Sequence, residues 1–333
     1  MPKTTLESIA KVFDVSAVAV WKALNNKKGV SEQMREKIKT YAKSVGYINS
    51  KSIINAKNKK FLFLINKDFF LTPSEQYYST IFYSLSYECS KSGSLLQMVF
   101  IETENTLDKI NRSIRSFRPD GIFIAGEISQ NISNYLMEQD VCIVHIDYFS
   151  PYQKFNAVYV NNYVMSYCLT KYLTSKGHKK IGFVGNIDKT SAIADRFFGY
   201  LKALNEEGLE FSYKWHIKNN LVNNDDITNL YFPEALSAYV CHCDAAAQRM
   251  YTALALKGLR VPEDVSIISF DNTPLCESII PNLTSAGPQK DYYAKKAFNT
   301  MIDSLNNKNK LFQVIIKTKL AERDSVRDLT SNS

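Results

Sequence analysis

The apolar positions near the start of the chain recur with the period of short α-helices. Four of them occupy the i, i+3, i+4 and i+7 positions of one helix face: Leu6, Ile9, Ala10 and Phe13. A break at Asp14-Val15 precedes a second predicted helix over 17–24, and a third runs from Ser31 to a C-terminal Gly46. Three short helices with a tight turn between the first two predict a helix-turn-helix.

From residue 61 the pattern changes to alternating strands and helices. Strands are predicted over the apolar runs 61–66, 94–101, 122–125, 141–147, 181–186, 238–244 and 265–271. Helices are predicted over 77–92, 107–117, 163–176, 196–207 and 245–257, with another between 125 and 141. This alternation predicts an α/β body of doubly wound parallel sheets with helices on both faces. Two such series in succession predict two lobes, with a ligand cleft outside the carboxyl ends of the strands.

Positive charge is concentrated in the predicted helical segment. Residues 1–60 hold 13 lysines and arginines against 4 acids, a net +9, whereas the whole chain carries +8. The basic excess therefore belongs to the first 60 residues and indicates a polyanion-binding module joined to a nearly neutral body. A solvated basic tail is the alternative, which the helical periodicity disfavours.

Other features narrow the functional class. No apolar run reaches the ~18 residues of a membrane span, and the start of the chain lacks the apolar stretch of a secretory signal. We expect a cytoplasmic protein without membrane contact, whose six cysteines are buried, unpaired thiols. No Ser/His/Asp set or glycine-rich phosphate loop stands in a convincing context, so neither enzyme activity nor a cofactor is expected.

The run Cys241-His242-Cys243 raises the hypothesis of a metal site. Alternation along the predicted strand would place both sulfurs on one face and the imidazole on the other. No second cluster has the spacing of a zinc site. Buried thiols are therefore favoured, and no metal is expected.

The N-terminal segment resembles the LacI/GalR-type (lactose-repressor-like) family of bacterial transcription regulators. The matching residues are Thr5-Leu6, Ile9-Ala10, Val15-Ser16, Val20, Ala23-Leu24-Asn25, Gly29-Val30-Ser31, Arg35-Glu36-Lys37-Ile38 and Val45-Gly46-Tyr47. The resemblance continues at lower density through RPDGI (118–122), GHKKIGFVG (177–185), RFFGY (196–200), VPEDVSII (261–268), PNLTS (281–285) and ERDS (322–325). It thus covers essentially the whole chain.

The resemblance implies a division of the chain into three parts. These are a DNA-binding headpiece over 1–47, a hinge over 48–60, and a periplasmic-binding-protein-like body over 61–330 for effector binding and dimerisation. Lobe 1 would comprise about 61–160 and 287–318, and lobe 2 about 161–286 and 319–330. The implied partners are double-stranded operator DNA, a second copy of the chain in a homodimer, and a small polar effector such as a sugar or sugar derivative.

The resemblance also implies the DNA contacts. Ala17, Val18 and Lys22 would face base edges in the major groove, and Lys22 can donate to guanine. Five residues match positions that hold the phosphate backbone: Thr5, Ser16, Asn25, Ser31 and Tyr47. Helix capping and turn formation are the alternative role of these polar side chains.

The headpiece and the hinge depart from the family pattern at several positions. Ala19 and Trp21 replace potential phosphate donors, and Trp21 would pack either on the sugar-phosphate backbone or on a neighbouring helix. In the hinge, Ala56 stands where the family has an apolar minor-groove wedge. Ile53, or its neighbour Ile54, is the remaining bulky candidate for that role, and a flexible basic linker is the alternative.

Effector contacts are implied for five residues near strand and loop ends: Tyr77, Tyr78, Asp147, Arg196 and Asp271. A planar guanidinium and two carboxylates suit a polyol, and the tyrosines could stack on a sugar ring. The structural alternatives are turn capping by Asp271 and an ion pair of Arg196 within its own lobe. Cys243 stands where the family has an asparagine, which removes one hydrogen-bonding amide.

Two other classes of protein share parts of this pattern. A solute-binding protein of the transport class has the same two-lobed body, but the missing signal sequence and the basic headpiece argue against it. A metabolic enzyme with a Rossmann-like fold would carry a glycine fingerprint after the strand at 61–66, and none is present.

Overall fold

The computed structural model describes residues 5–25, 27–45, 47, 57–71, 76–102, 106–218, 221, 226–233, 236–307 and 309–330. The chain forms two compact units, Met1–Lys57 and Asn58–Ser333. We call them the headpiece and the body, and each is described by itself. No helix in the described part of the chain is long and apolar enough to cross a membrane.

The headpiece consists of α1 (Leu6–Phe13), α2 (Ala17–Leu24) and α3 (Glu32–Ser44), as the apolar spacing predicts. Their inward faces form one small core of Ile9, Ala10, Val20, Ala23, Ile38 and Ala42. Asp14 ends α1 in the left-handed conformation (φ 49°), which makes the sharp turn into α2. The expected C-terminal Gly46 of α3 lies outside the described residues.

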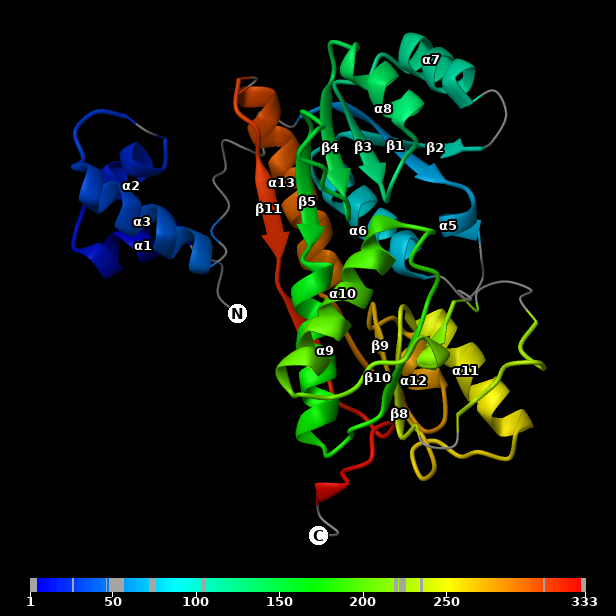
Figure 1. Cartoon of the computed structure of the whole chain (residues 1–333). Helices are drawn as coiled ribbons and strands as arrows, with labels where there is room; N and C mark the ends of the chain where they lie inside the picture. Colours follow the sequence, from blue (N-terminus) through cyan, green and yellow to red (C-terminus); the bar gives the residue numbers. More distant parts are fainter. Residues whose placement is uncertain are drawn as a thin grey trace. The chain divides into compact units, whose positions relative to one another are not determined.

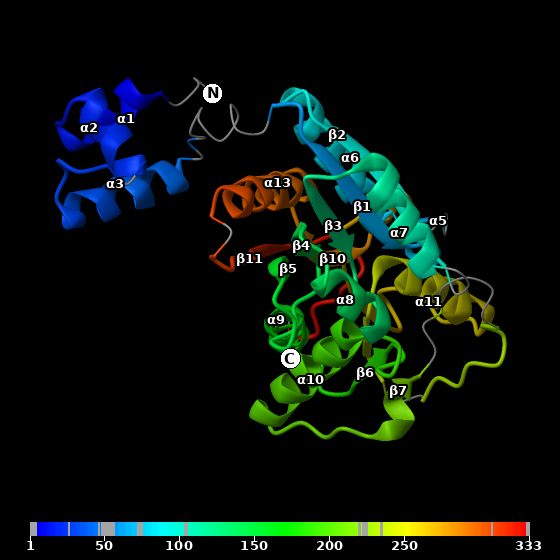
Figure 2. The same cartoon turned by 90° about the horizontal axis from the view of Figure 1, so that it is seen from above.

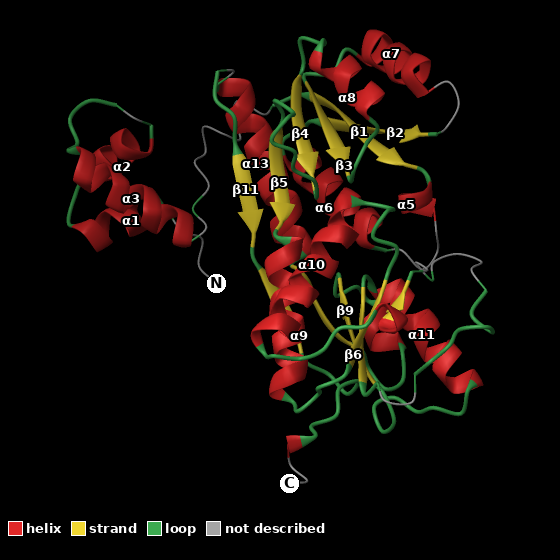
Figure 3. Ribbon diagram, in the orientation of Figure 1, coloured by secondary structure: helices red, strands yellow, loops and turns green. Residues whose placement is uncertain are grey.

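The body contains two six-stranded sheets, one in each lobe (Figures 1 and 3). Sheet A, in lobe 1, has the order β11 (Gln313–Ile316), β5 (Asn156–Val160), β4 (Cys142–Ile146), β3 (Gly121–Ala125), β1 (Lys60–Asn66) and β2 (Leu95–Ile101). Sheet B, in lobe 2, has the order β12 (Thr318–Ala321), β10 (Thr284–Pro288), β9 (Ser266–Phe270), β8 (Ala238–Cys241), β6 (Ile181–Val184) and β7 (His216–Ile217). The predicted α/β fold with two sheet-based lobes is therefore confirmed.

One strand pair departs from the predicted parallel arrangement. β12 runs antiparallel to β10, with Ser285 opposite Ala321, whereas the other strand pairs of both sheets are parallel. The antiparallel pairing arises because the chain leaves sheet A at β11 and enters sheet B directly at β12, without a crossover helix.

Helices cover both faces of each sheet. Lobe 1 has α5 (Asp68–Leu71), α6 (Tyr77–Lys91), α7 (Thr106–Phe117), α8 (Gln130–Met137) and α13 (Lys290–Asn306). Lobe 2 has α9 (Asn162–Ser175), α10 (Ser191–Glu206), the 3₁₀ turn η1 (Tyr213–Trp215), α11 (Asp244–Leu256) and α12 (Leu275–Ser278). Figure 2 shows α9 and α10 packed side by side.

Alternate residues of the strands serve the two helical layers. In β1, Leu62 and Leu64 belong to the core under α7 and α8, whereas the Phe61 ring lies 6.2 Å from that of Phe298 in α13. In sheet B, the Phe183 ring lies 5.3 Å from that of Phe197 in α10. The opposite face of sheet B packs on α11. Both sheets are thus buried on both sides, as the continuous apolar strands predict.

The boundaries differ from the predicted ones at two places near the cleft. Helix α10 begins at Ser191, five residues before the predicted start at Arg196, because Thr190 accepts a hydrogen bond from the Ile193 amide and caps it there. Strand β8 ends at Cys241, three residues before the predicted end, because α11 begins at Asp244.

Candidate functional site

A cavity of about 310 Å³ lies between the two lobes of the body. Lobe 1 supplies residues that follow β1, β3 and β4, and sheet A points the carboxyl ends of these strands toward lobe 2 (Figure 3). Lobe 2 supplies the first turns of α10 and α11 and the loop after β9. All five residues proposed from the sequence for effector contact line this cavity: Tyr77, Tyr78, Asp147, Arg196 and Asp271.

Asp147 follows β4 directly and is held by tyrosine hydroxyls. Tyr77 donates to its carboxylate at 3.1 Å and Tyr78 at 3.0 Å. Tyr293 of α13, which sequence reasoning missed, donates to the same carboxylate at 3.4 Å and to the Val158 carbonyl at 2.8 Å. Burial raises the pKa of Asp147, and nearby Arg196 and the tyrosine hydroxyls oppose that rise. The carboxylate therefore fixes the two tyrosines whose rings line the cavity.

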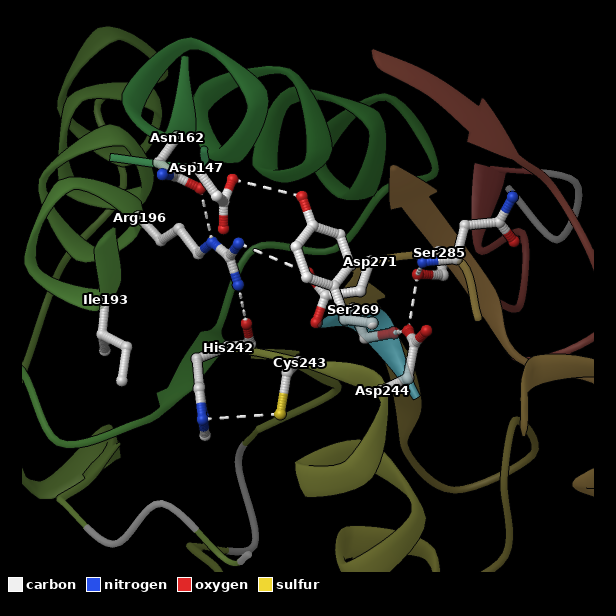
Figure 4. A network of polar contacts seen from close by, with 12 residues as sticks. Asp147, Asn162, Ile193, Arg196, His242, Cys243, Asp244, Ser269, Asp271 and Ser285 are labelled. Atoms are coloured by element: carbon white, nitrogen blue, oxygen red, sulfur yellow. Dashed lines mark hydrogen bonds and ion pairs between the residues drawn. The ribbon is translucent and has the colours of Figure 1, made fainter. Parts of the chain in front are cut away.

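Arg196 lies in α10 and is almost fully buried in lobe 2 (Figure 4). Its Nε donates to Asn162 Oδ1 at 2.8 Å, its Nη1 donates to the His242 carbonyl, and its Nη2 lies 3.4 Å from Asp271 Oδ1. The guanidinium also stacks over the Phe270 ring, 4.7 Å from the centroid. The ion pair within lobe 2, considered from the sequence as the structural alternative, is present, and Arg196 still lines the cavity.

Asp271 follows β9 with a left-handed backbone (φ 96°), which points its side chain to Arg196. Burial raises the pKa of this carboxyl to about 6, although Arg196 opposes the rise. A group that titrates near neutrality in a cavity can bind a ligand hydroxyl in a pH-dependent way. The loop itself is fixed from behind, because Lys290 donates to the backbone carbonyls of Asp271 and Asn272.

Asp244 is a buried cavity residue for which the sequence suggested no role. Its carboxylate accepts hydrogen bonds from the Ser269 hydroxyl (2.5 Å), the Ser285 hydroxyl (2.6 Å), and the amide and hydroxyl of Thr273 (2.7 and 2.9 Å). These contacts, drawn in part in Figure 4, tie α11 to β9, β10 and the loop that carries Asp271. Asp244 therefore positions the wall of the cavity.

The geometry expected for Cys241-His242-Cys243 is wrong, because the strand ends at Cys241. Cys243 is the N-cap of α11, and its sulfur accepts a hydrogen bond from the Ala246 amide at 3.4 Å. His242 Nε2 lies 3.5 Å from the same sulfur, and burial, together with nearby Arg196, lowers the His242 pKa to about 3. Within the described ranges, no group of three metal-ligating side chains is present.

Glu127 and Ser191 join the two walls of the cavity. Glu127 follows β3 in lobe 1, and its Oε2 accepts from the Ser191 amide at 2.8 Å and from the Ser191 hydroxyl at 2.9 Å. Ser191 is the first residue of α10 in lobe 2. A carboxylate at a helix N-terminus complements both the unpaired amides and the helix dipole. No local sequence signal points to this contact, because it joins residues 64 positions apart.

The polar residues proposed for DNA contact have structural roles within the headpiece. Thr5, Ser16 and Ser31 cap the three helices through the amides of Ser8, Ala19 and Met34. Asn25 donates to the Trp21 carbonyl at 2.8 Å, and Tyr47 packs against the headpiece core. The capping and turn-forming alternative is therefore seen for these polar side chains. Ile53 and the whole wedge region lie outside the described residues.

The outer side of α2 is largely apolar. Val18 is 60% exposed, Ala17 and Trp21 are half-buried, and Lys22 is the basic residue in the last turn. The loop after α2 is fixed by Arg35 of α3, whose guanidinium donates to the Lys27 carbonyl at 3.0 Å and the Val30 carbonyl at 3.3 Å. The exposed side chains of α2 are thus held on a small, well-capped scaffold.

Comparisons with known proteins agree with this architecture. The model of the periplasmic binding protein-like domain matches residues 170–326. The HTH-type transcriptional repressor PurR of Vibrio cholerae serotype O1 (strain M66-2) is 25% identical over 341 residues, which cover 98% of this chain and 99% of that protein.

Two solved structures extend the comparison. The putative transcriptional regulator LacI from Bacillus cereus subsp. cytotoxis NVH 391-98 has 25% identity and a TM-score of 0.69, covering 81% of this chain and 99% of that one. The transcriptional regulator CelR-cellobiose complex has 17% identity and a TM-score of 0.67, covering 97% of this chain and 99% of that one. The match to that second structure includes both the headpiece and the body.

Proposed function

Since the chain belongs to the LacI/GalR-type family of bacterial transcription regulators, we propose that it represses transcription by binding operator DNA under the control of a small polar effector. It is a regulator and not an enzyme. The observation that carries the proposal is the presence, in one chain, of a helix-turn-helix headpiece and a cavity between two lobes. The solute-binding alternative is set aside, because the full-length relatives are transcriptional repressors.

We propose that residues 1–47 read the operator, 48–60 form the hinge, and 61–330 bind effector and dimerise. Lobe 1 takes about 61–160 and 287–318, and lobe 2 takes the rest. A homodimer is supported by exposed apolar side chains on the α9–α10 pair, Tyr163, Val164 and Phe198, and on α6, Tyr83 and Tyr87. The two headpieces of the dimer then bind the two halves of a pseudo-palindromic operator. We also propose that the protein acts in the cytoplasm, where the operator DNA lies.

In the proposed DNA complex, α2 lies in the major groove. Ala17 and Val18 contact thymine methyl groups and Lys22 donates to a guanine edge. Thr5, Ser16, Asn25, Ser31 and Tyr47 contact phosphates, and Trp21 packs on the adjacent sugar-phosphate backbone, with Ile53 reaching the minor groove from the hinge. The capping seen in the headpiece is compatible with this role, since helix N-termini and their cap residues commonly meet phosphates.

In the proposed effector complex, a sugar or sugar derivative occupies the cavity between the lobes. The CelR structure holds cellobiose, and a polyol suits this lining. Asp271 and Asp147 accept from hydroxyls, Arg196 donates to ring or hydroxyl oxygens, and the Tyr77 and Tyr78 rings cover an apolar face. The effector changes DNA affinity only if it binds two arrangements of the lobes with different affinity.

Two measurements test the proposal. Selection from a random duplex library should enrich a pseudo-palindromic site whose affinity falls steeply with salt. A thermal-shift screen of the full chain against sugars and sugar derivatives should find one that raises Tm, because a ligand that binds the folded state stabilises it by mass action. The proposal fails if no duplex sequence is enriched over bulk DNA.

A further inference from the structure

We propose that the cavity between the lobes selects an uncharged or amino-bearing polyol and discriminates against phosphorylated and carboxylated ones. The inference rests on the proposed effector function and adds the charge class of the effector. Three independent features of the described residues support it: the charge of the lining, the engagement of Arg196, and the occupation of a helix N-terminus by Glu127.

The lining of the cavity carries an excess of carboxylates. Five acids reach it, Asp68, Glu127, Asp147, Asp244 and Asp271, against the cations Lys189 and Arg196. Lys189 is exposed at the edge, whereas Asp147, Asp244 and Asp271 lie deep in the protein. The cations close to these three carboxylates are Arg196 and, behind the Asp271 loop, Lys290, and each already has acceptors in the protein. An anionic group placed among the carboxylates would therefore meet like charge in a medium of low dielectric constant, where repulsion is strongest.

The buried cation of the lining is already paired. Nε, Nη1 and Nη2 of Arg196 each have an acceptor, namely Asn162, the His242 carbonyl and Asp271. A phosphate that binds this guanidinium in the usual forked geometry would compete with Asp271 and the His242 carbonyl for it. A neutral hydroxyl makes no such demand, because it accepts one remaining N–H and donates to a neighbouring carboxylate.

The N-terminus of α10, which opens on the cavity, is occupied by a carboxylate of the protein. A helix of this length ordinarily offers its first amides to an anion. Here the amide and hydroxyl of Ser191 both donate to Glu127, and the amide of Ile193, two residues further on, donates to the Thr190 hydroxyl. An incoming phosphate would have to displace Glu127 and then lie beside its negative charge.

The N-terminus of α11 also disfavours an anion. Its N-cap is Cys243, whose sulfur accepts from the Ala246 amide, and its first residue is the buried Asp244. The first turns of both helices therefore already hold acceptor groups of the protein, namely Glu127 and Thr190 at α10 and Cys243 at α11. An ammonium group of a ligand, by contrast, could pair with the carboxylates of Glu127 and Asp68 at the rim of the cavity. A ligand hydroxyl could donate to those of Asp271 and Asp147 inside it.

The direct test compares matched ligands on the full chain. D-Glucose, D-glucosamine and D-glucose 6-phosphate form one set, and D-ribose and D-ribose 5-phosphate form another, with cellobiose as a larger neutral member. Thermal shift ranks them, and calorimetric titration gives Kd for those that bind. We expect the best ligand to be neutral or amino-bearing, with its phosphorylated counterpart bound at least about tenfold more weakly.

The possible outcomes distinguish a failure of the charge inference from a failure of the proposed effector function. A phosphorylated member that binds more tightly than its neutral parent overturns the charge inference, while the effector function of the cavity survives. A panel in which no member raises Tm also overturns the inference, because none of its neutral or amino-bearing sugars is then bound. The two failures are thus distinct, and DNA selection reports separately on the operator function.

A charge-neutralising variant tests the part assigned to Glu127. Glu127→Gln removes one negative charge at the rim while keeping the size of the side chain. We expect the ratio of Kd values, phosphorylated over neutral, to fall by roughly fivefold to tenfold, because one repelling charge is lost. Glu138→Gln is the matched control, since Glu138 is exposed at the end of α8, outside the cavity lining. A ratio that stays unchanged in Glu127→Gln contradicts the proposal.

Discussion

The ion pair between Arg196 and Asp271 stabilises the fold of lobe 2, and both of its residues also line the cavity. We predict that Arg196→Ala destabilises the body strongly, and that adding Asp271→Asn restores part of the loss. The side chains of the pair are 7% and 14% exposed, and their charged atoms lie 3.4 Å apart. Removing the guanidinium takes away the ion-pair partner of the buried Asp271 carboxylate, and it also leaves Asn162 Oδ1 and the His242 carbonyl without the donor that Arg196 supplies.

The expected magnitude follows from the geometry. At 3.4 Å, two unit charges attract by about 5 kcal/mol when the effective dielectric constant is about 20, and the desolvation of both groups offsets part of this gain. Breaking one partner of such a buried pair costs about 3–5 kcal/mol, which lowers Tm by on the order of 10 °C. The double variant leaves no unpaired charge, so the coupling energy should be about 1–3 kcal/mol.

The loss in Arg196→Ala should also depend on pH. Burial raises the pKa of Asp271 to about 6 in the wild type, and removing the opposing guanidinium raises it further. A carboxyl whose folded pKa lies above the unfolded value of about 3.9 adds no penalty at low pH. The penalty grows as the pH rises and is complete above the folded pKa. The stability gap between Arg196→Ala and the wild type should therefore shrink as the pH falls from about 7.5 to about 5.

The losses in stability and the coupling energy are measured by thermal and urea unfolding. The proteins compared are the wild type, both single variants and the double variant. The matched control is the exposed pair Arg260 and Asp264, at 3.0 Å, whose Arg260 side chain is 70% exposed. Arg260→Ala should leave Tm nearly unchanged. Strictly additive losses in the Arg196 and Asp271 cycle, or a gap that does not vary with pH, would refute the reasoning.

Substitutions at three further positions test separate features. Lys22→Ala should weaken operator binding by about 1–3 kcal/mol and relax base preference without altering effector affinity; gel-shift titration that finds both unchanged removes Lys22 as a base reader. Gly199→Ala should destabilise the body by about 1–3 kcal/mol, because the added Cβ would collide with the backbone carbonyl of Tyr163; an unchanged Tm would contradict the close approach of α9 and α10. Asp244→Ala should cost more stability than Asp244→Asn, since an amide oxygen can still accept from the Thr273 amide; equal losses would show that the hydrogen bonds do not matter.

The sequence predicts those parts of the fold whose side chains repeat with a regular period. The strands β1, β3 and β4 are continuous apolar runs, and the headpiece helices combine a cap with an apolar face, so their positions follow from local chemistry. Strand β10 has no such signal, although every residue in it is buried. Its sequence TSAGP consists of small and polar residues, and its burial depends on the hydrogen bonds that Thr284 and Ser285 donate to the distant residues Ser325 and Asp244.

The residues of the candidate site likewise divide into those that the sequence predicts and those that only the folded structure reveals. Arg196, Asp271 and Asp147 stand beside recognisable strands and helices, so their place at the cavity can be expected from the order of elements. The contact of Glu127 with Ser191 and that of Tyr293 with Asp147 join segments far apart along the chain. Only the folded arrangement brings these partners together, and a single sequence contains no pattern that records it.

The way in which the chain returns to sheet B has a consequence for synthesis on the ribosome. Strand β12 and Ser325 complete that sheet, and the Ser325 hydroxyl accepts from the Thr284 amide at 2.8 Å and donates to the Ile267 carbonyl at 2.6 Å. The headpiece leaves the ribosome first and can fold at once, whereas lobe 2 must wait for a segment made after much of lobe 1. A nascent chain that is interrupted before residue 318 therefore carries a folded headpiece on a body whose sheet B lacks the edge strand β12. Translation thus completes the DNA-binding headpiece before it completes the effector-binding body.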